Sequence, residues 1–145
     1  MNDTYTRGNT VERQHLIQLV DRLTNEELNH PLEAGWTIAG VLTHLAFWDQ
    51  RALVLLKKWQ QEGIGPSAID VDVVNEATRL LCIALPLRVA AQLAISTAEA
   101  IDRAIEHLDP AMIAEIETKG QTVRLNRADH RQEHLTQIEQ ALKII

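Results

Sequence analysis

Residues 36–61, WTIAGVLTHLAFWDQRALVLLKKWQQ, decide the fold class of this chain. The apolar residues of this stretch that share one helical face are Ile38, Val41, Leu45, Trp48, Ala52, Leu55 and Trp59. Because this spacing gathers them on one arc at about 100° per residue, it predicts a long amphipathic helix with one buried face. Thr37 is the expected N-cap, since its hydroxyl can accept a hydrogen bond from an amide of the first turn.

The same helical period recurs in four other segments. It predicts long helices over residues 10–23, 87–107 and 127–143, and a shorter helix over residues 71–84. Thr10 is the expected N-cap of the first of these. With the tryptophan-rich helix, the three long segments make four main helices, and four amphipathic helices pack most simply as a bundle.

The connections between these helices carry turn signals. Residues 24–27 read TNEE, a capping-box pattern that predicts a short helical turn. Residues 62–67 read EGIGPS and form the clearest loop, whereas residues 111–126 show little beyond a turn of helix and Gly120. No segment has the pattern of a strand. We therefore predict an all-α fold, a four-helix bundle with additional short helices, in one domain over residues 1–145.

The composition of the chain limits the partners and the kinds of site that it can have. The 145 residues carry a net charge of −6, and no cluster of Lys and Arg follows one face, which argues against a nucleic-acid partner. Cys82 is the only cysteine, so an intrachain disulfide and a cysteine-based zinc cluster are both excluded. The polar N-terminal residues and the lack of a long apolar stretch predict no membrane partner and a cytoplasmic location.

Three histidines are the candidate functional residues. His130 and His134 are four residues apart, so both imidazoles lie on one helix face, with His134 within its apolar arc and His130 at the edge of that arc. His44 lies within the apolar arc of the tryptophan-rich helix. A buried imidazole needs a partner for each ring nitrogen, and one metal ion shared by three imidazoles meets that need. Three protein ligands leave coordination positions open, as in catalytic metal sites.

Two other interpretations of these histidines exist. Each one can be a core residue that only forms hydrogen bonds. The order His130-x-x-Glu133-His134 also matches a metalloprotease pattern that requires a third ligand well downstream. Only 11 residues follow His134 and Glu133 projects to the polar side, so a ligand from upstream fits better. The remaining histidines, His15, His30 and His107, are predicted to be ordinary surface residues.

Two stretches resemble the ligand-bearing helices of the DinB/YfiT-like superfamily: residues 35–49, GWTIAGVLTHLAFWD, and residues 128–135, ADHRQEHL. Residues 71–76, which include Asn75, are similar to the segment after the mid-chain loop of that family. The resemblance extends from about Val11 to Leu142. It implies a four-helix bundle, a homodimer and one divalent metal ion, with His44, His130 and His134 as the ligands. Zinc and nickel are the expected metals, because both bind imidazole well.

The resemblance also implies a range of activities. Members of the superfamily transfer low-molecular-weight thiols such as bacillithiol or mycothiol, isomerise maleylpyruvate, or resemble hydrolases. We therefore expect a metal-dependent enzyme that performs thiol transfer or hydrolysis on a small electrophilic substrate. The alternative is a non-catalytic, metal-binding dimer that serves as a stress-response or ligand-binding module.

Few other residues offer catalytic chemistry. The sequence has no glycine-rich phosphate loop, no nucleophilic serine motif and no Cys/His dyad. Asp49, about one and a half turns after His44, is the candidate general base, with a solvated surface charge as its alternative. Trp36 and Trp48 are expected either to pack in the core or to line the mouth of an apolar pocket.

Overall fold

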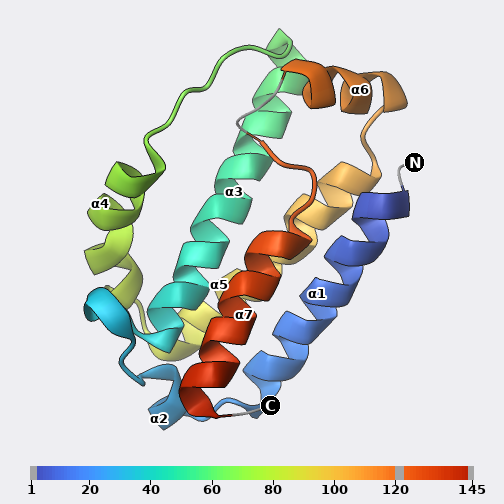
Figure 1. Cartoon of the computed structure of the whole chain (residues 1–145). Helices are drawn as coiled ribbons and strands as arrows, with labels where there is room; N and C mark the ends of the chain where they lie inside the picture. The colour runs from blue at the N-terminus through green and yellow to red at the C-terminus, as the bar shows by residue number, and fades with distance from the viewer. Residues whose placement is uncertain (1–2, 120–122, 144–145) are drawn as a thin grey trace.

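Four long helices form the body of the molecule in the computed structural model, which describes residues 3–119 and 123–143 (Figure 1). They are α1 (Asp3–Arg22), α3 (Ile38–Glu62), α5 (Leu87–Glu106) and α7 (Ala128–Leu142). The described residues form helices and connections, with no strand beyond one isolated bridge between Pro31 and Thr37. The predicted all-α four-helix bundle is therefore confirmed.

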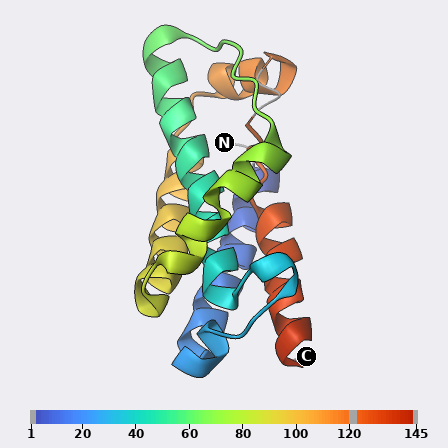
Figure 2. The same cartoon turned by 90° about the vertical axis from the view of Figure 1, so that its left-hand side faces the viewer.

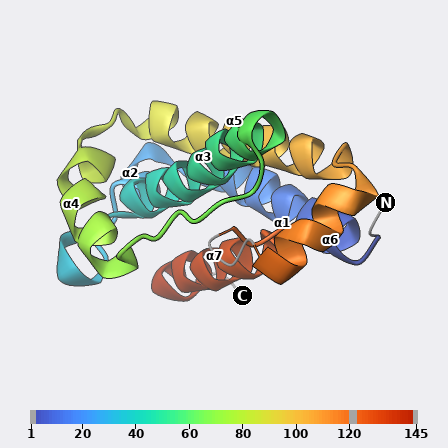
Figure 3. The same cartoon turned by 90° about the horizontal axis from the view of Figure 1, so that it is seen from above.

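The four helices form a ring in the order α1, α5, α3, α7 (Figure 3). Helices α3 and α5 run in one direction and α1 and α7 in the other (Figure 1). Two consecutive parallel helices need a long crossover connection. Here the crossover consists of the loop after α3 and α4 (Val71–Ala84), which packs along α3. The seam between α3 and α7 is the most loosely packed of the four.

Shorter helices lie at the two ends of the bundle (Figure 2). Helix α2 (Asn25–Leu28) and the 3₁₀ helix η1 (Glu33–Gly35) connect α1 to α3. The predicted capping box is confirmed, because the Thr24 hydroxyl accepts from the Glu27 amide at 3.1 Å while the Glu27 carboxylate accepts from the Thr24 amide at 2.9 Å. Thr37 caps α3 as predicted, with its hydroxyl 2.9 Å from the Gly40 amide.

Helix α1 begins seven residues before the predicted N-cap, so Thr10 lies inside the helix and the prediction of its capping role was wrong. The added turns are polar in sequence, and contacts with distant residues hold them. The buried Asn9 side chain donates to the Leu125 carbonyl at 3.0 Å and accepts from the Arg127 and Ala128 amides. The periodicity of a local sequence segment does not reveal hydrogen-bond partners that lie more than a hundred residues away.

Helix α6 (Pro110–Lys119) occupies much of the segment in which only a turn was predicted. Its buried residues are Ile113 and Ile116, which pack in the apolar cluster at that end of the bundle. Gly120, the predicted break, lies outside the described residues. Two apolar residues one turn apart are too few to distinguish a short helix from a loop by periodicity.

The interior is divided into two apolar clusters with a polar layer between them. One cluster contains Leu42, Leu45, Ala94 and Leu135, and the other contains Leu56 and Ile101 with their neighbours. The layer between them consists of buried charged and polar side chains: Asn9, Asp49, Asp102, Arg127 and Arg131. No helix in the described part of the chain has the length and apolar character required to cross a membrane.

Candidate metal centre

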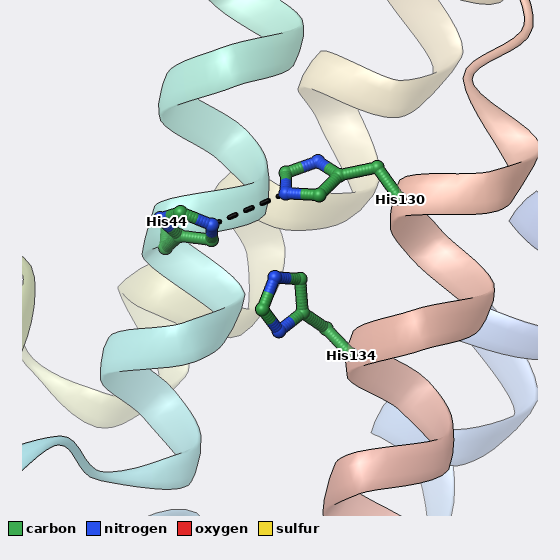
Figure 4. Close-up of side chains that lie close together, drawn as sticks. All are labelled: His44, His130 and His134. Atoms are coloured by element: carbon green, nitrogen blue, oxygen red, sulfur yellow. Dashed lines mark hydrogen bonds between the residues drawn. The ribbon is translucent and has the colours of Figure 1, made fainter. Parts of the chain in front are cut away.

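The three predicted ligand histidines converge at the seam between α3 and α7 (Figure 4). His44 Nε2 and His130 Nε2 are 3.1 Å apart, and one ligand atom from each histidine lies within 4.8 Å of the others. The ring centroids of His134 lie 4.8 Å from those of His44 and 4.9 Å from those of His130. Residues separated by 86 positions therefore form one compact cluster.

The helices and two neighbouring side chains orient these rings. The four-residue spacing of His130 and His134 places both on the side of α7 that faces α3, as expected for a helix. Gln137 lies one turn further along α7, and its Oε1 atom is 2.9 Å from His134 Nδ1, so Nε2 of that ring faces the cluster. Trp36 contacts His44 edge-on, with 5.6 Å between ring centroids.

The environment of the cluster favours neutral imidazoles. Burial and, to a smaller extent, the proximity of His134 lower the pKa of His44 to about 4. Burial, followed by the proximity of His134, His44, Arg127 and Arg131, lowers the pKa of His130 to about 3. A metal ion binds imidazole only through an unprotonated nitrogen, so His44 and His130 are ready to act as ligands at neutral pH.

A pocket with a volume of about 730 Å³ opens beside the histidines. Its wall combines the cluster with aromatic, aliphatic and charged side chains of α3, α4 and α7 and of the connections that precede these three helices. The lining residues are Trp36, Val41, His44, Trp48, Arg51, Ala52, Ile69, Val71, Asn75, Val123, Arg124, Asn126, Arg127, Asp129, His130, Glu133, His134 and Gln137. Pockets of this size accommodate small organic molecules.

The sequence model of the DinB superfamily matches residues 10–138 of the chain. This chain belongs to the DinB superfamily. The match includes all three histidines and the four long helices in whole or in part. No curated protein and no solved structure gives a significant match. Members of the DinB superfamily often bind a divalent metal, so the histidine cluster is the part of this member to test against that property.

The donor set of this DinB-superfamily member fits a divalent metal. Two nitrogen ligands at about 2.0–2.1 Å from one ion lie about 3.0–3.4 Å apart, which agrees with the 3.1 Å between His44 Nε2 and His130 Nε2. Among the described residues, the cluster of potential ligand side chains has three members and no fourth protein ligand. His44 Nε2 faces the cluster and is the nitrogen available to an ion, whereas His44 Nδ1 is buried without a hydrogen-bond partner among the described residues.

The two tryptophans that the sequence left between core and pocket line the pocket and are half-buried. Trp48 Nε1 donates to Asn75 Oδ1 at 2.9 Å, which ties α3 to α4 across the pocket wall. Among the other histidines, His107 is exposed, as predicted. His30 and His15 are half-buried, and the two ring nitrogens of His15 lie 3.1 Å from Glu12 and 3.0 Å from Glu139.

Asp49, the predicted general base, lies in the polar layer and not among the residues that line the pocket. Its Oδ1 accepts from Arg127 Nε at 2.9 Å, and its Oδ2 accepts from Arg131 Nη2 at 3.3 Å. The surface-charge alternative is wrong, because the residue is only 3% exposed. A catalytic role for Asp49 stays a prediction, and its hydrogen bonds indicate a carboxylate that holds α7 against α3.

The rest of this ion-pair network was missed from the sequence. Arg131 donates to both oxygens of Asp102 on α5, at 2.8 and 2.9 Å, and Arg13 on α1 donates to the same carboxylate at 2.6 Å. Together with Asp49 and Arg127 these residues link all four bundle helices. The sequence did contain a sign of this network. Asp49, Asp102 and Arg131 each occupy a position on the apolar face of their helix, and the two aspartates are opposite in charge to the arginine.

Proposed function

We propose that this DinB-superfamily member is a divalent-metal-dependent enzyme that performs thiol transfer or hydrolysis on a small electrophilic substrate. The convergence of three imidazoles at the wall of a large pocket carries the proposal. His44 and His130 are held neutral by burial, and all three histidines lie where a small molecule can reach them. A purely structural metal site would be closed by a fourth protein ligand.

In the proposed reaction, His44, His130 and His134 would hold one zinc or nickel ion. Such an ion would supply Lewis acidity, the chemistry that makes a water or thiol nucleophilic near neutral pH. Gln137 fixes the ring of His134 by its contact with Nδ1, and Trp36 packs against the ring of His44. Trp48, Ile69 and Val71 supply an apolar wall that can exclude water from a bound substrate.

The first experiment measures metal content in His44→Ala, His130→Ala and His134→Ala after purification and reloading with zinc or nickel. Each variant is expected to lose the metal while its helical circular dichroism is retained. His107→Ala is the matched control, because His107 is exposed and lies outside the cluster. Full occupancy in any one of the three variants would remove that residue from the site.

The second experiment tests the reaction. Metal-loaded protein is incubated with bacillithiol, mycothiol or glutathione and an electrophilic acceptor, and with ester or amide substrates for hydrolysis. Turnover that disappears in His130→Ala supports the enzyme. Metal binding without turnover in any combination would favour the alternative, a non-catalytic metal-binding module for ligand binding or stress response.

The proposal includes a homodimer. Helix α4 supports it, because Val73, Leu80 and Leu81 are 61%, 64% and 70% exposed on one face of that helix. Exposed apolar side chains that share a face mark interaction surfaces. Light scattering is expected to give twice the chain mass of 16.3 kDa, and a monomer mass at micromolar concentration would contradict the dimer.

A further inference from the structure

One end of the pocket is lined by three arginines. Arg51 comes from α3, whereas Arg124 and Arg127 come from the segment that leads into α7. The chain as a whole carries a net charge of −6, so a group of cations around one cavity runs against its general composition. Arginine is the side chain best suited to bind carboxylate and phosphate groups, through its planar set of donors.

The arginines lie to one side of the histidine cluster. Arg51 follows His44 by seven residues, which is two turns or about 10 Å along α3. Arg127 precedes His130 by three residues, which is about one turn. Because α3 and α7 run in opposite directions, both displacements point toward the same end of the bundle (Figure 1). The pocket thus has a histidine end and a cationic end.

Neighbouring groups hold the Arg51 guanidinium in place. Its Nη2 donates to the Ser67 carbonyl at 3.2 Å and to the Ser67 hydroxyl at 3.1 Å, and the group lies over the Trp48 ring at 5.9 Å from the centroid. Burial lowers the pKa of Arg51, and the charge of Arg127 lowers it further. The two cations are therefore within electrostatic reach of each other, and an anion between them would relieve their repulsion.

Arg127 belongs both to the pocket wall and to the polar layer behind it, where it pairs with Asp49. With Arg127 included, three guanidinium groups of the layer face two carboxylates, Asp49 and Asp102, so the layer as a whole carries one net positive charge. Asp129 and Glu133 also line the pocket, and they are exposed, as Arg124 is, so water and salt screen all three charges. The less exposed charged side chains of the wall are Arg51, which is half-buried, and Arg127, which is buried.

We propose that the arginine end of the pocket binds an anionic group of the substrate, a carboxylate or a phosphate, whose apolar body lies along Trp48, Ile69 and Val71. This inference deepens the proposed function, on which it rests for the assignment of the histidine end to the reaction. The substrate class is a small organic anion whose reactive centre is separated from its charged group by about 10 Å or less. Arg51 is the main determinant of that specificity.

The test uses three probes that share one apolar chain: hexanoate, hexyl phosphate and the uncharged hexanamide. Calorimetric titrations are run on protein stripped of metal and on the same protein reloaded with zinc. The variants are Arg51→Gln, the charge-retaining Arg51→Lys, and Lys57→Gln, which removes one charge from an exposed position of the same helix outside the pocket. If Arg51→Gln fails to fold, the exposed Arg124→Gln replaces it.

The expected result is that metal-stripped protein binds at least one anion about tenfold or more tightly than hexanamide. Arg51→Gln should lose this preference, Arg51→Lys should keep part of it, and Lys57→Gln should change the affinity by less than about twofold. The tighter of the two anions identifies the charged group as carboxylate or phosphate.

Three results would overturn the inference: equal affinity for hexanamide, unchanged anion binding in Arg51→Gln, or anion binding that requires zinc and ignores Arg51. Metal analysis of the same samples distinguishes failure of the anion-site inference from failure of the proposed metal-dependent enzyme. Zinc uptake without an arginine-dependent anion site rejects only the inference. Anion binding in protein that cannot take up zinc rejects only the metal-dependent enzyme.

Discussion

Two polar clusters occupy neighbouring turns of α3 and α7, and they satisfy their polar atoms in different ways. In the ion-pair network, Asp49 and Asp102 accept at both oxygens from arginines of the protein itself. In the histidine cluster, His44 Nε2 and His130 Nε2 share one hydrogen bond, His44 Nδ1 is buried without a partner among the described residues, and the rings border a pocket. The difference indicates that the network holds the helices together, whereas the histidines are arranged for a ligand.

The largest effect is expected from Arg131→Met, which removes the central cation of the network. Arg131 is 1% exposed and bonds to both buried carboxylates, so its loss leaves charge without full compensation. The free energy of unfolding should fall by about 3–5 kcal/mol. Urea denaturation measures it, with Lys58→Met in an exposed ion pair as the control, expected to change stability by less than about 1 kcal/mol.

Acidification of the metal-free protein should act on the histidine cluster. The pKa values of His44 and His130 are about 4 and about 3 when folded, against 6.5 for a free histidine. Between the folded pKa values and 6.5, the unfolded chain therefore binds more protons than the folded protein. The contribution of these histidines to the free energy of unfolding is complete above pH 6.5 and falls as the pH drops toward 4.

The expected loss between pH 7 and 4.5 is about 2–4 kcal/mol, measured by urea denaturation at each pH. Zinc should restore part of the loss near pH 6, where it competes with protons for the same nitrogens. A His130→Asn variant should show a flatter profile. An unchanged profile in that variant would show that the histidine cluster does not govern the acid sensitivity.

Asp49→Asn distinguishes the network from the catalytic role predicted for this residue. The substitution keeps the size of the side chain but removes the charge that faces Arg127 and Arg131. Stability should fall by about 1–3 kcal/mol while metal content is retained. Asp129→Asn, at an exposed position on α7, is the control and should cost less than about 0.5 kcal/mol. Loss of turnover at unchanged stability would instead support Asp49 as the general base.

The smallest effect is expected from Gln137→Ala, which removes the side chain beside His134 Nδ1. A ligand histidine without its outer hydrogen bond loses orientation, so zinc affinity should fall by about tenfold. Stability should stay within about 0.5 kcal/mol, because Gln137 is half-buried at the edge of the pocket. Competition with a chromogenic zinc chelator measures the affinity, and Gln140→Ala at an exposed position is the control.

The sequence predicted what depends on local pattern. The cap at Thr37, the capping box at residues 24–27 and the shared face of His130 and His134 each depend on residues within one or two turns. The convergence of His44 with that pair was also predicted, because all three positions belong to inward-facing arcs of amphipathic helices. A bundle brings such arcs together whatever the details of its connections.

What the sequence did not predict depends on long-range pairing. The first turns of α1 are helical because Asn9 bonds to Leu125, Arg127 and Ala128. The assignment of Asp49 to a general base considered its own helix alone, while its partners lie 78 and 82 residues away. The charge of a side chain shows that it needs a partner, but only the packing of the helices shows which partner it finds.

The meeting of α3 with α7 has a consequence for the order in which the protein matures. His44 leaves the ribosome 86 residues before His130, so a growing chain has only one of the three imidazoles until α7 has been made. Ligation by all three residues would then close a loop over residues 44–134, as a covalent cross-link between distant residues would. A metal ion that binds all three histidines would therefore stabilise only chains in which α7 has already packed against α3.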